Sequence, residues 1–179
     1  MEMEKHEIVI PAAAIDDPHA LNDRAMALHD AGQYEGAILD CSAAIALDPK
    51  DADYYINRGA TYDALKCYEL ARNDYNKALR LSPNNPDAYN NRGVCCRLAG
   101  DYAQALEDYN SAIALSPNFA MAYRNRARLY EALGETAKSE EDWARAAAIQ
   151  APADTTTEGR ATARGNHRLP GIFKHRQGH

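Results

Sequence analysis

The fold of this chain is decided by residues 86–119, which read PDAYNNRGVCCRLAGDYAQALEDYNSAIALSPNF. Three further units of 34 residues, at 18–51, 52–85 and 120–153, follow the same pattern. The matches are chemical, because the eighth, twentieth and twenty-seventh residues of every unit are small; position eight holds Ala25, Gly59, Gly93 and Ala127. Small side chains at fixed positions let two helices cross closely. The sustained period therefore predicts one helical unit stacked four times.

These small residues recur together with a tyrosine at position four of the later units, at Tyr55, Tyr89 and Tyr123. A proline closes the first three units, at Pro49, Pro83 and Pro117. The pattern resembles the tetratricopeptide repeat. The resemblance implies an all-α fold, a right-handed superhelical solenoid of four antiparallel helix hairpins. It also implies a surface that binds proteins or peptides, although the fold alone does not name the partner.

Helix ends are marked in the sequence. Asp17 before Pro18, and Asn85 before Pro86, are typical of a helix N-terminus, with a capping side chain followed by proline at the first helical position. The first helices are expected to end near Ala31, Leu65, Ala99 and Leu133. A left-handed residue commonly closes a helix at the next position, which holds Gly32, Lys66, Gly100 and Gly134. Three of these four residues suit that conformation.

Composition divides the chain into a repeat domain, 18–153, and two flanking segments, 1–17 and 154–179. The first segment carries Ile8, Val9 and Ile10, and we expect it to cap the first helix or to lie in a groove. The last segment holds five basic and two acidic residues without apolar periodicity, which is typical of disorder. The whole chain has 26 acidic and 20 basic residues, so the repeat domain is acidic.

An acidic domain repels phosphate backbones, which argues against a nucleic-acid partner. No stretch approaches the roughly 18 apolar residues of a membrane span, and the first residues lack the pattern of a secretory signal, so we expect a cytoplasmic protein. The cysteines form no CxxC or CxxH pair, which argues against a metal site. No catalytic triad order and no glycine-rich phosphate loop is present, so we expect neither a catalytic residue nor a cofactor.

Two charged positions recur in every unit. Position seven, commonly leucine in the resembled family, is arginine, and position twenty-three is aspartate; the residues are Arg24, Arg58, Arg92 and Arg126, and Asp40, Asp74, Asp108 and Asp142. Their matched numbers predict structural ion pairs between a first and a second helix, within one unit or across to the next. In the alternative interpretation, the arginines line a groove and bind the carboxylates of a partner.

Position six holds the better candidates for function, which are Asp23, Asn57, Asn91 and Asn125. The resemblance implies that first helices line the concave face of the solenoid and that position six points into it. A file of asparagines there resembles the ladder with which some members hold an extended peptide. A carboxamide offers both a donor and an acceptor, so it can bind a peptide group without reading the side chain. The alternative is a merely polar, solvated groove.

Neighbouring positions on the first helices are expected to supply side-chain contacts in the same groove. The further candidates for peptide binding are Asn22, Asp53, Asp87, Asn90, Arg124 and Arg128. Counting Asp63 and Arg97 as well, the groove is predicted to be acidic in the early units and basic in the last. A clamp for a C-terminal carboxylate, built in some members from Lys, Asn and Arg, matches this sequence only at its asparagine position.

These observations predict a non-catalytic adaptor that binds a peptide or protein segment in its concave groove. A second interpretation is a self-assembling scaffold. In that case, the apolar N-terminal segment or the basic C-terminal segment of one copy engages the acidic groove of another, which gives a homo-oligomer.

Overall fold

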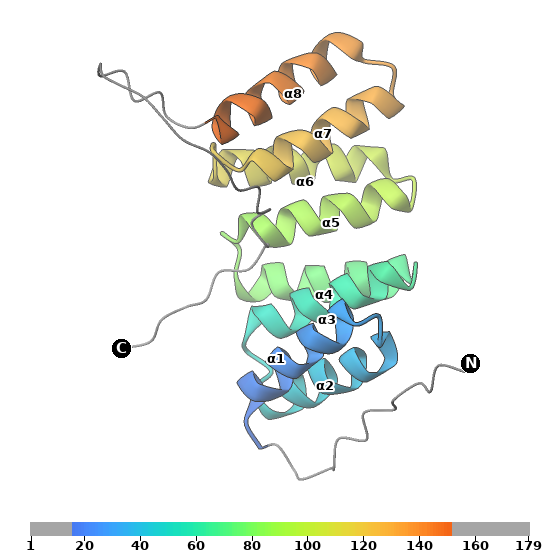
Figure 1. Ribbon diagram of the computed structural model, residues 1–179, viewed down its shortest axis with the longest axis vertical. Helices are drawn as coiled ribbons and strands as arrows, with labels where there is room; N and C mark the ends of the chain where they lie inside the picture. Colours follow the sequence, from blue (N-terminus) through green and yellow to red (C-terminus); the bar gives the residue numbers. More distant parts are fainter. Residues whose placement is uncertain (1–15, 152–179) are drawn as a thin grey trace, which may run out of the picture.

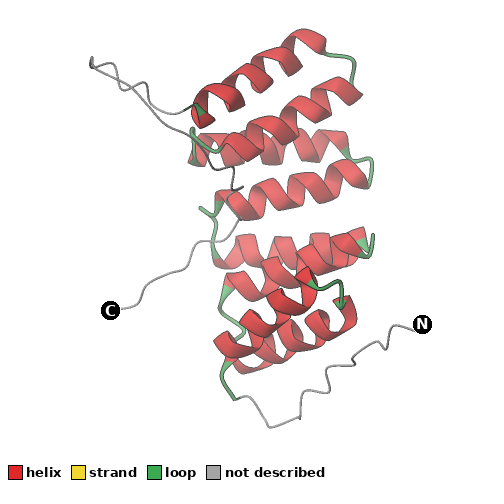
Figure 2. Cartoon of the chain, viewed as in Figure 1, coloured by secondary structure: helices red, strands yellow, loops and turns green. Residues whose placement is uncertain are grey.

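The computed structural model describes residues 16–151, and this part of the chain forms eight helices and no strand. They are α1 (Pro18–Asp30), α2 (Tyr34–Leu47), α3 (Ala52–Ala64), α4 (Tyr68–Leu81), α5 (Pro86–Leu98), α6 (Tyr102–Leu115), α7 (Ala120–Ala132) and α8 (Thr136–Gln150). Consecutive helices pair as antiparallel hairpins joined by short turns (Figures 1 and 2). The predicted all-α repeat fold is therefore confirmed.

The predicted helix signals are confirmed as well. Asp17 and Asn85 cap α1 and α5, because their side chains accept hydrogen bonds from the backbone amides of His19 and Ala88. The residues that follow the first helices all adopt positive φ, with values of 74° at Gly32, 60° at Lys66, 87° at Gly100 and 74° at Gly134. Lys66 adopts this left-handed conformation although it has a Cβ atom, so its backbone conformation costs more free energy than that of the three glycines.

The hairpins close on the small residues at position eight. A Cβ atom built on Gly59 would lie 2.9 Å from Cε1 of Tyr75, and one on Gly93 would lie 2.7 Å from Cε1 of Tyr109. Both tyrosine side chains are at most 1% exposed. In the central two units, glycine therefore provides the room for a tyrosine on the second helix. The outer units have alanine at this position instead, and Cys41 and Trp143 hold the sequence position of the two tyrosines.

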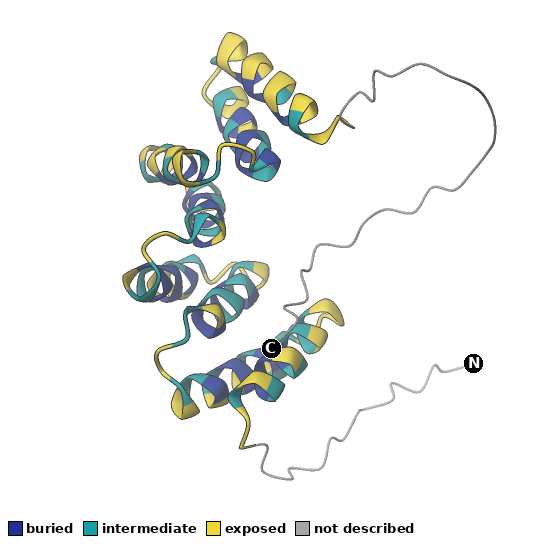
Figure 3. Ribbon diagram, turned by 90° about the vertical axis from the view of Figure 1, so that its left-hand side faces the viewer, coloured by how far each residue is buried: buried dark blue, intermediate teal, exposed yellow. Residues whose placement is uncertain are grey.

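The stack of hairpins is curved (Figure 3). The first helices α3, α5 and α7 follow one another on one side of the stack and the second helices α4 and α6 lie behind them (Figure 1). The turn by 90° in Figure 3 shows that the column bends toward the side of the first helices. No helix within residues 16–151 is both long and apolar enough to cross a bilayer. The expectations for the N-terminal segment before Asp16 and for the C-terminal segment after Ala151 lie outside the described residues.

Candidate functional site

The four arginines at position seven each pair with the aspartate of their own unit. In unit three, Nε and Nη2 of Arg92 donate to the two carboxylate oxygens of Asp108 at 2.9 and 2.6 Å. The same two-point contact joins Arg24 to Asp40, Arg58 to Asp74 and Arg126 to Asp142. We call these contacts the arginine–aspartate ladder. It links the first and second helices within each hairpin.

Three of the arginines also reach back to the preceding unit. Nη1 of Arg58 donates to Ser42 at 3.0 Å. Nη1 of Arg92 donates to Asn76 at 2.7 Å, and Nη1 of Arg126 donates to Asn110 at 2.6 Å. Each of these guanidinium groups therefore joins three helices. The hydrogen bond to the aspartate is the main cause that raises the pKa of Arg92, which stays charged. Because Nε and Nη2 of each arginine are bonded within the chain, the geometry supports structural ion pairs over arginines that bind a partner's carboxylates.

A second set of contacts joins consecutive first helices. Nδ2 of Asn57 donates to Oδ1 of Asn22 at 2.9 Å, and Nδ2 of Asn125 donates to Oδ1 of Asn90 at 2.8 Å. In both cases position six contacts position five of the preceding unit, 35 residues earlier. We call this set the asparagine ladder. It lies along the junctions of units one and two and of units three and four.

The asparagine ladder is interrupted at the central junction. The residue 35 positions before Asn91 is Ile56, whose side chain has no hydrogen-bond acceptor. Oδ1 of Asn91 accepts a 3.3 Å bond from Asn90, while its Nδ2 group has no partner among residues 16–151. Ile56 instead packs against a buried cluster formed by Ala71, Tyr75 and Cys95. The interruption therefore leaves a free amide donor beside an apolar side chain.

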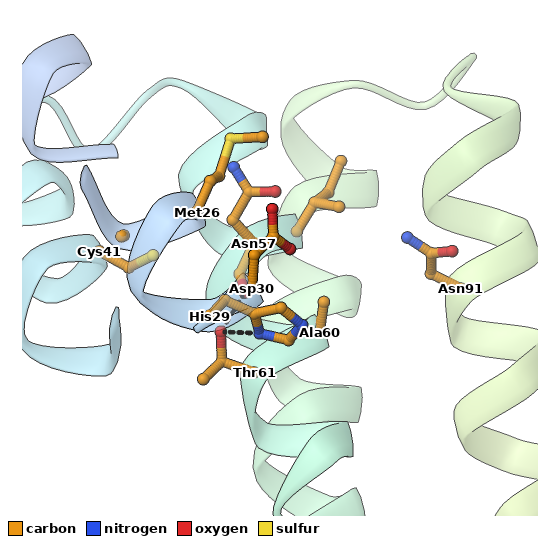
Figure 4. A pocket seen from close by; sticks show the side chains of 10 residues that line it. Met26, His29, Asp30, Cys41, Asn57, Ala60, Thr61 and Asn91 are labelled. Carbon is orange, nitrogen blue, oxygen red and sulfur yellow. Dashed lines mark hydrogen bonds between the residues drawn. The ribbon is translucent and has the colours of Figure 1, made fainter. Parts of the chain in front are cut away.

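A recess opens at this interruption, with a volume of about 230 Å³. Side chains from α1, α3 and α5 line it together with Cys41 of α2; the lining residues are Ala25, Met26, His29, Asp30, Cys41, Ile56, Asn57, Ala60, Thr61 and Asn91. Figure 4 shows the carboxamide of Asn91 pointing from α5 toward the residues on α1 and α3. Asn57 and Asn91 are predicted from the sequence to lie in this region, whereas the recess itself, lined by Ile56 where the ladder lacks an asparagine, is not.

The remaining predicted site residues fall into two groups. Asp23, Asp53, Asp87 and Arg128 are exposed on first helices, and Arg124 is half-buried. Asn22, Asn90 and Asn125 are buried, at 8%, 5% and 5% exposure. These three asparagines are members of the asparagine ladder: Asn22 accepts from Asn57, and Asn90 accepts from Asn125. Arg124 donates to Gln150, and Arg128 donates to Oδ1 of Asn125 at 3.4 Å and lies over the Trp143 ring.

Two acidic side chains at position twelve, Asp63 of unit two and Glu131 of unit four, contact second helices, whereas Asp63 is expected from the sequence to line the groove. Oδ2 of Asp63 accepts a 2.8 Å hydrogen bond from the hydroxyl of Tyr75, and its Oδ1 is buried without a hydrogen-bond partner in the described part of the chain. Burial raises the pKa of this carboxyl group. Glu131 likewise accepts from Nε1 of Trp143 at 2.8 Å. These side chains contact the second helix of their own unit. The predicted acidic character of the groove therefore depends on the other aspartates.

Stacked hairpins with small residues at every crossing define an α-helical repeat protein. Models of the tetratricopeptide repeat match residues 86–119 and 109–141, and a TPR repeat model matches residues 25–66 and 65–95. These matches follow one another over residues 25–141. The chain therefore belongs to the tetratricopeptide repeat family. A comparison with curated protein sequences gives no match.

Solved structures share the fold. A crystal structure of MamA superposes with a TM-score of 0.69 at 22% identity, covering 77% of this chain and 81% of that one. The TPR domain of Arabidopsis OM64 gives 0.62 at 28% identity, covering 65% and 96%. The first TPR domain of Spaghetti (RPAP3), described as bound to the HSP90 peptide SRMEEVD, gives 0.63 at 25% identity, covering 66% and 94%.

Proposed function

We propose that this protein is a non-catalytic adaptor that holds an extended peptide segment of another protein along its first helices. The observation that carries the proposal is the interrupted asparagine ladder, because it leaves Nδ2 of Asn91 without a partner among the described residues beside a recess. A backbone carbonyl of an extended peptide is a suitable acceptor for that group. The side chain of the same peptide would enter the recess.

The similarity to the RPAP3 domain supports a peptide as the class of ligand, since that domain is described as bound to one. Its peptide, SRMEEVD, carries three acidic residues. The first three units here instead expose Asp23, Asp30, Asp53 and Asp87 on their first helices. Because like charges repel, we expect this groove to favour a neutral or basic peptide.

The binding free energy of a peptide requires contacts with its side chains in addition to hydrogen bonds from the asparagine side chains of the groove. At a net 0.5 to 1.5 kcal/mol for each hydrogen bond, two asparagines contribute about 1 to 3 kcal/mol. A micromolar complex needs roughly 8 kcal/mol. The larger part of the binding free energy therefore has to come from side chains of the peptide, and the recess is the hollow that the groove offers near Asn57 and Asn91.

The experiment is a selection of random peptides displayed on phage against the full chain, followed by fluorescence anisotropy of the selected peptides. We expect the double variant Asn57→Ala with Asn91→Ala to weaken binding about tenfold, as the loss of one to two hydrogen bonds predicts. A matched control replaces Asn73 and Asn84, which are exposed and belong to neither the asparagine ladder nor the recess.

Two results would contradict the proposal: a selection that yields no peptide above background, or selected peptides that bind the double variant and wild type equally. The second interpretation, self-assembly, is distinguished from a monomeric adaptor by the molecular mass that light scattering measures over a concentration series. A mass that rises with concentration, and returns to that of one chain when a selected peptide is added, would mean that a second copy occupies the groove.

A further inference from the structure

We propose that the recess between α1, α3 and α5 is a specificity pocket for a long basic side chain, arginine or lysine, of the bound peptide. This inference rests on the proposed function, because it names the chemistry of the peptide that the groove selects. It is carried by three features of the recess: the size and apolar character of its floor, the excess of hydrogen-bond acceptors at its rim, and its charge.

The floor suits the methylene groups of a long side chain. Ala25, Met26, Ile56 and Ala60 supply apolar surface on α1 and α3. The volume of about 230 Å³ exceeds the roughly 150 Å³ of an engineered apolar cavity that binds benzene. One large side chain therefore fits. Arginine and lysine commonly bury their methylene stems on such surfaces while their charged ends stay at a polar rim.

His29 presents an acceptor at the rim. Oγ1 of Thr61 donates its only hydrogen to the backbone carbonyl of Asn57 at 2.8 Å. The 3.1 Å contact between Oγ1 of Thr61 and Nδ1 of His29 must then have the histidine as donor. The proton of a neutral His29 is thereby placed on Nδ1, which leaves Nε2 as an acceptor. Figure 4 shows this ring beside Ala60 among the residues that line the recess.

The other rim groups add acceptors and a negative charge. The carboxylate of Asp30 lines the recess and forms no hydrogen bond or ion pair with any residue in the described range. Asn57 donates through Nδ2 to Asn22, so its Oδ1 is the group left for a guest. Nδ2 of Asn91 is the free donor, and it suits a peptide carbonyl. Acceptors thus outnumber donors, and the nearest formal charge is that of a carboxylate.

A basic side chain satisfies this set better than an aliphatic or acidic one. Its N–H groups can donate to Asp30, to Nε2 of His29 and to Oδ1 of Asn57, whereas an aliphatic group would leave these acceptors without donors. An acidic group would lie beside the carboxylate of Asp30 and be repelled. The apolar floor alone would accept a norleucine side chain, so the comparison of basic with aliphatic side chains decides between the two.

The experiment is a nuclear magnetic resonance titration of the full chain with capped peptides of sequence Gly-Ala-Ala-Xaa-Ala-Ala-Gly. Xaa is arginine, lysine, citrulline, norleucine or glutamate. We expect the arginine and lysine peptides to shift the side-chain amide signals of Asn91 and the backbone signals of Asp30 and Ala60. They should bind about threefold to fivefold more tightly than the citrulline peptide, the range of an ion pair at a protein surface.

Two variants test the location. Asp30→Asn should abolish the preference for arginine over citrulline, while Glu140→Gln, an equal change of charge at an exposed site on α8, should leave it unchanged. Ala60→Leu should fill the recess and weaken the binding of every peptide with a long central side chain. Norleucine binding as tightly as arginine, or a preference that survives Asp30→Asn, would overturn the inference.

The outcomes also separate this inference from the proposed function. If peptides from the phage selection depend on Asn57 and Asn91 but are indifferent to Ala60→Leu and carry no recurrent basic residue, the groove binds peptides and the basic pocket is wrong. If no peptide binds in either experiment, both proposals fail.

Discussion

The two ladders of this molecule differ in regularity. The arginine–aspartate ladder is present in all four units with the same two-point geometry. The asparagine ladder is present at two junctions and interrupted between units two and three, where Ile56 replaces the acceptor. The first ladder joins the two helices of every hairpin. The second ladder varies from junction to junction while the hairpins stack in the same way, and the recess lies where it is interrupted.

Removing one arginine of the regular ladder should have the largest effect. The side chain of Asp108 is 1% exposed, so Arg92→Ala leaves a buried carboxylate with only Gln104 as a side-chain donor. We expect a loss of about 3 to 5 kcal/mol in the free energy of unfolding. Arg24→Ala should cost less, because that pair is more exposed, at 27% and 10%, and Arg24 has no bond to an earlier unit within the described residues.

Urea unfolding followed by circular dichroism measures both changes. A loss below about 1 kcal/mol for Arg92→Ala, the value of an exposed ion pair, would show that the first ladder contributes little to stability. Equal losses for Arg92→Ala and Arg24→Ala would show that burial does not set its strength.

Adding a methyl group at Gly93, next to Tyr109 and Asp108, should lower the stability by less than the removal of Arg92. A Cβ atom at Gly93 would lie 2.7 Å from Cε1 of Tyr109 and 3.2 Å from Cβ of Asp108. Overpacking of this kind costs about 1 to 3 kcal/mol, and alanine returns up to about 1 kcal/mol of helix propensity. We expect Gly93→Ala to lower stability by about 1 to 2 kcal/mol.

Gly36→Ala is the matched control in the thermal unfolding assay. The new Cβ would meet the end of the flexible Leu28 side chain at 3.2 Å, so the gain in helix propensity should dominate. An increase in stability for both variants would mean that the hairpins are not closed on position eight.

The asparagine ladder should contribute less still. Asn125→Ala leaves the buried Oδ1 of Asn90 without its donor, which should cost about 1 kcal/mol. Asn91→Ala removes only the acceptor of a 3.3 Å bond, so we expect a loss below about 1 kcal/mol together with weaker peptide binding. Chemical denaturation of the two variants in parallel shows which one loses more free energy of unfolding. A greater loss for Asn91→Ala would remove the contrast between the intact and interrupted junctions.

Repairing an irregular turn should have the smallest effect and the opposite sign. Lys66 has a φ of 60° where three other units have glycine. Lys66→Gly should raise the free energy of unfolding, measured by urea unfolding, by about 0.5 to 1 kcal/mol, because it relieves the left-handed conformation. Gly100→Lys, the reverse change at the equivalent turn, should lower it. A decrease for Lys66→Gly would mean that the lysine side chain contributes a stabilising contact of its own.

The sequence predicted the hairpins well because their determinants are local. The caps at Asp17 and Asn85, and the turn residues at Gly32, Gly100 and Gly134, act on neighbours a few residues away, so the chain alone reveals them. The 34-residue period then places one hairpin on the next.

The details of the groove depend on contacts between units, and here the sequence was less informative. It left open whether Arg92 pairs with an aspartate of its own unit or of the next, and the structure shows the pair within the unit, with Asp108, and a separate hydrogen bond to Asn76 of the preceding unit. It counted Asp63 as part of the acidic groove, whereas that carboxylate contacts Tyr75. The recess had one signal in the sequence: unit two alone combines an apolar residue at position five, Ile56, with the small Ala60 at position nine.

The backward reach of Arg58, Arg92 and Arg126 bears on the mechanics of the groove. Because each guanidinium is bonded to three helices, neighbouring units cannot rotate against one another without breaking charged hydrogen bonds. These bonds therefore restrain the rotation of neighbouring units and, with it, the spacing of the asparagines on the first helices. A peptide bound as proposed above would meet a preorganised surface, and little of the binding free energy would be lost to ordering the repeat domain.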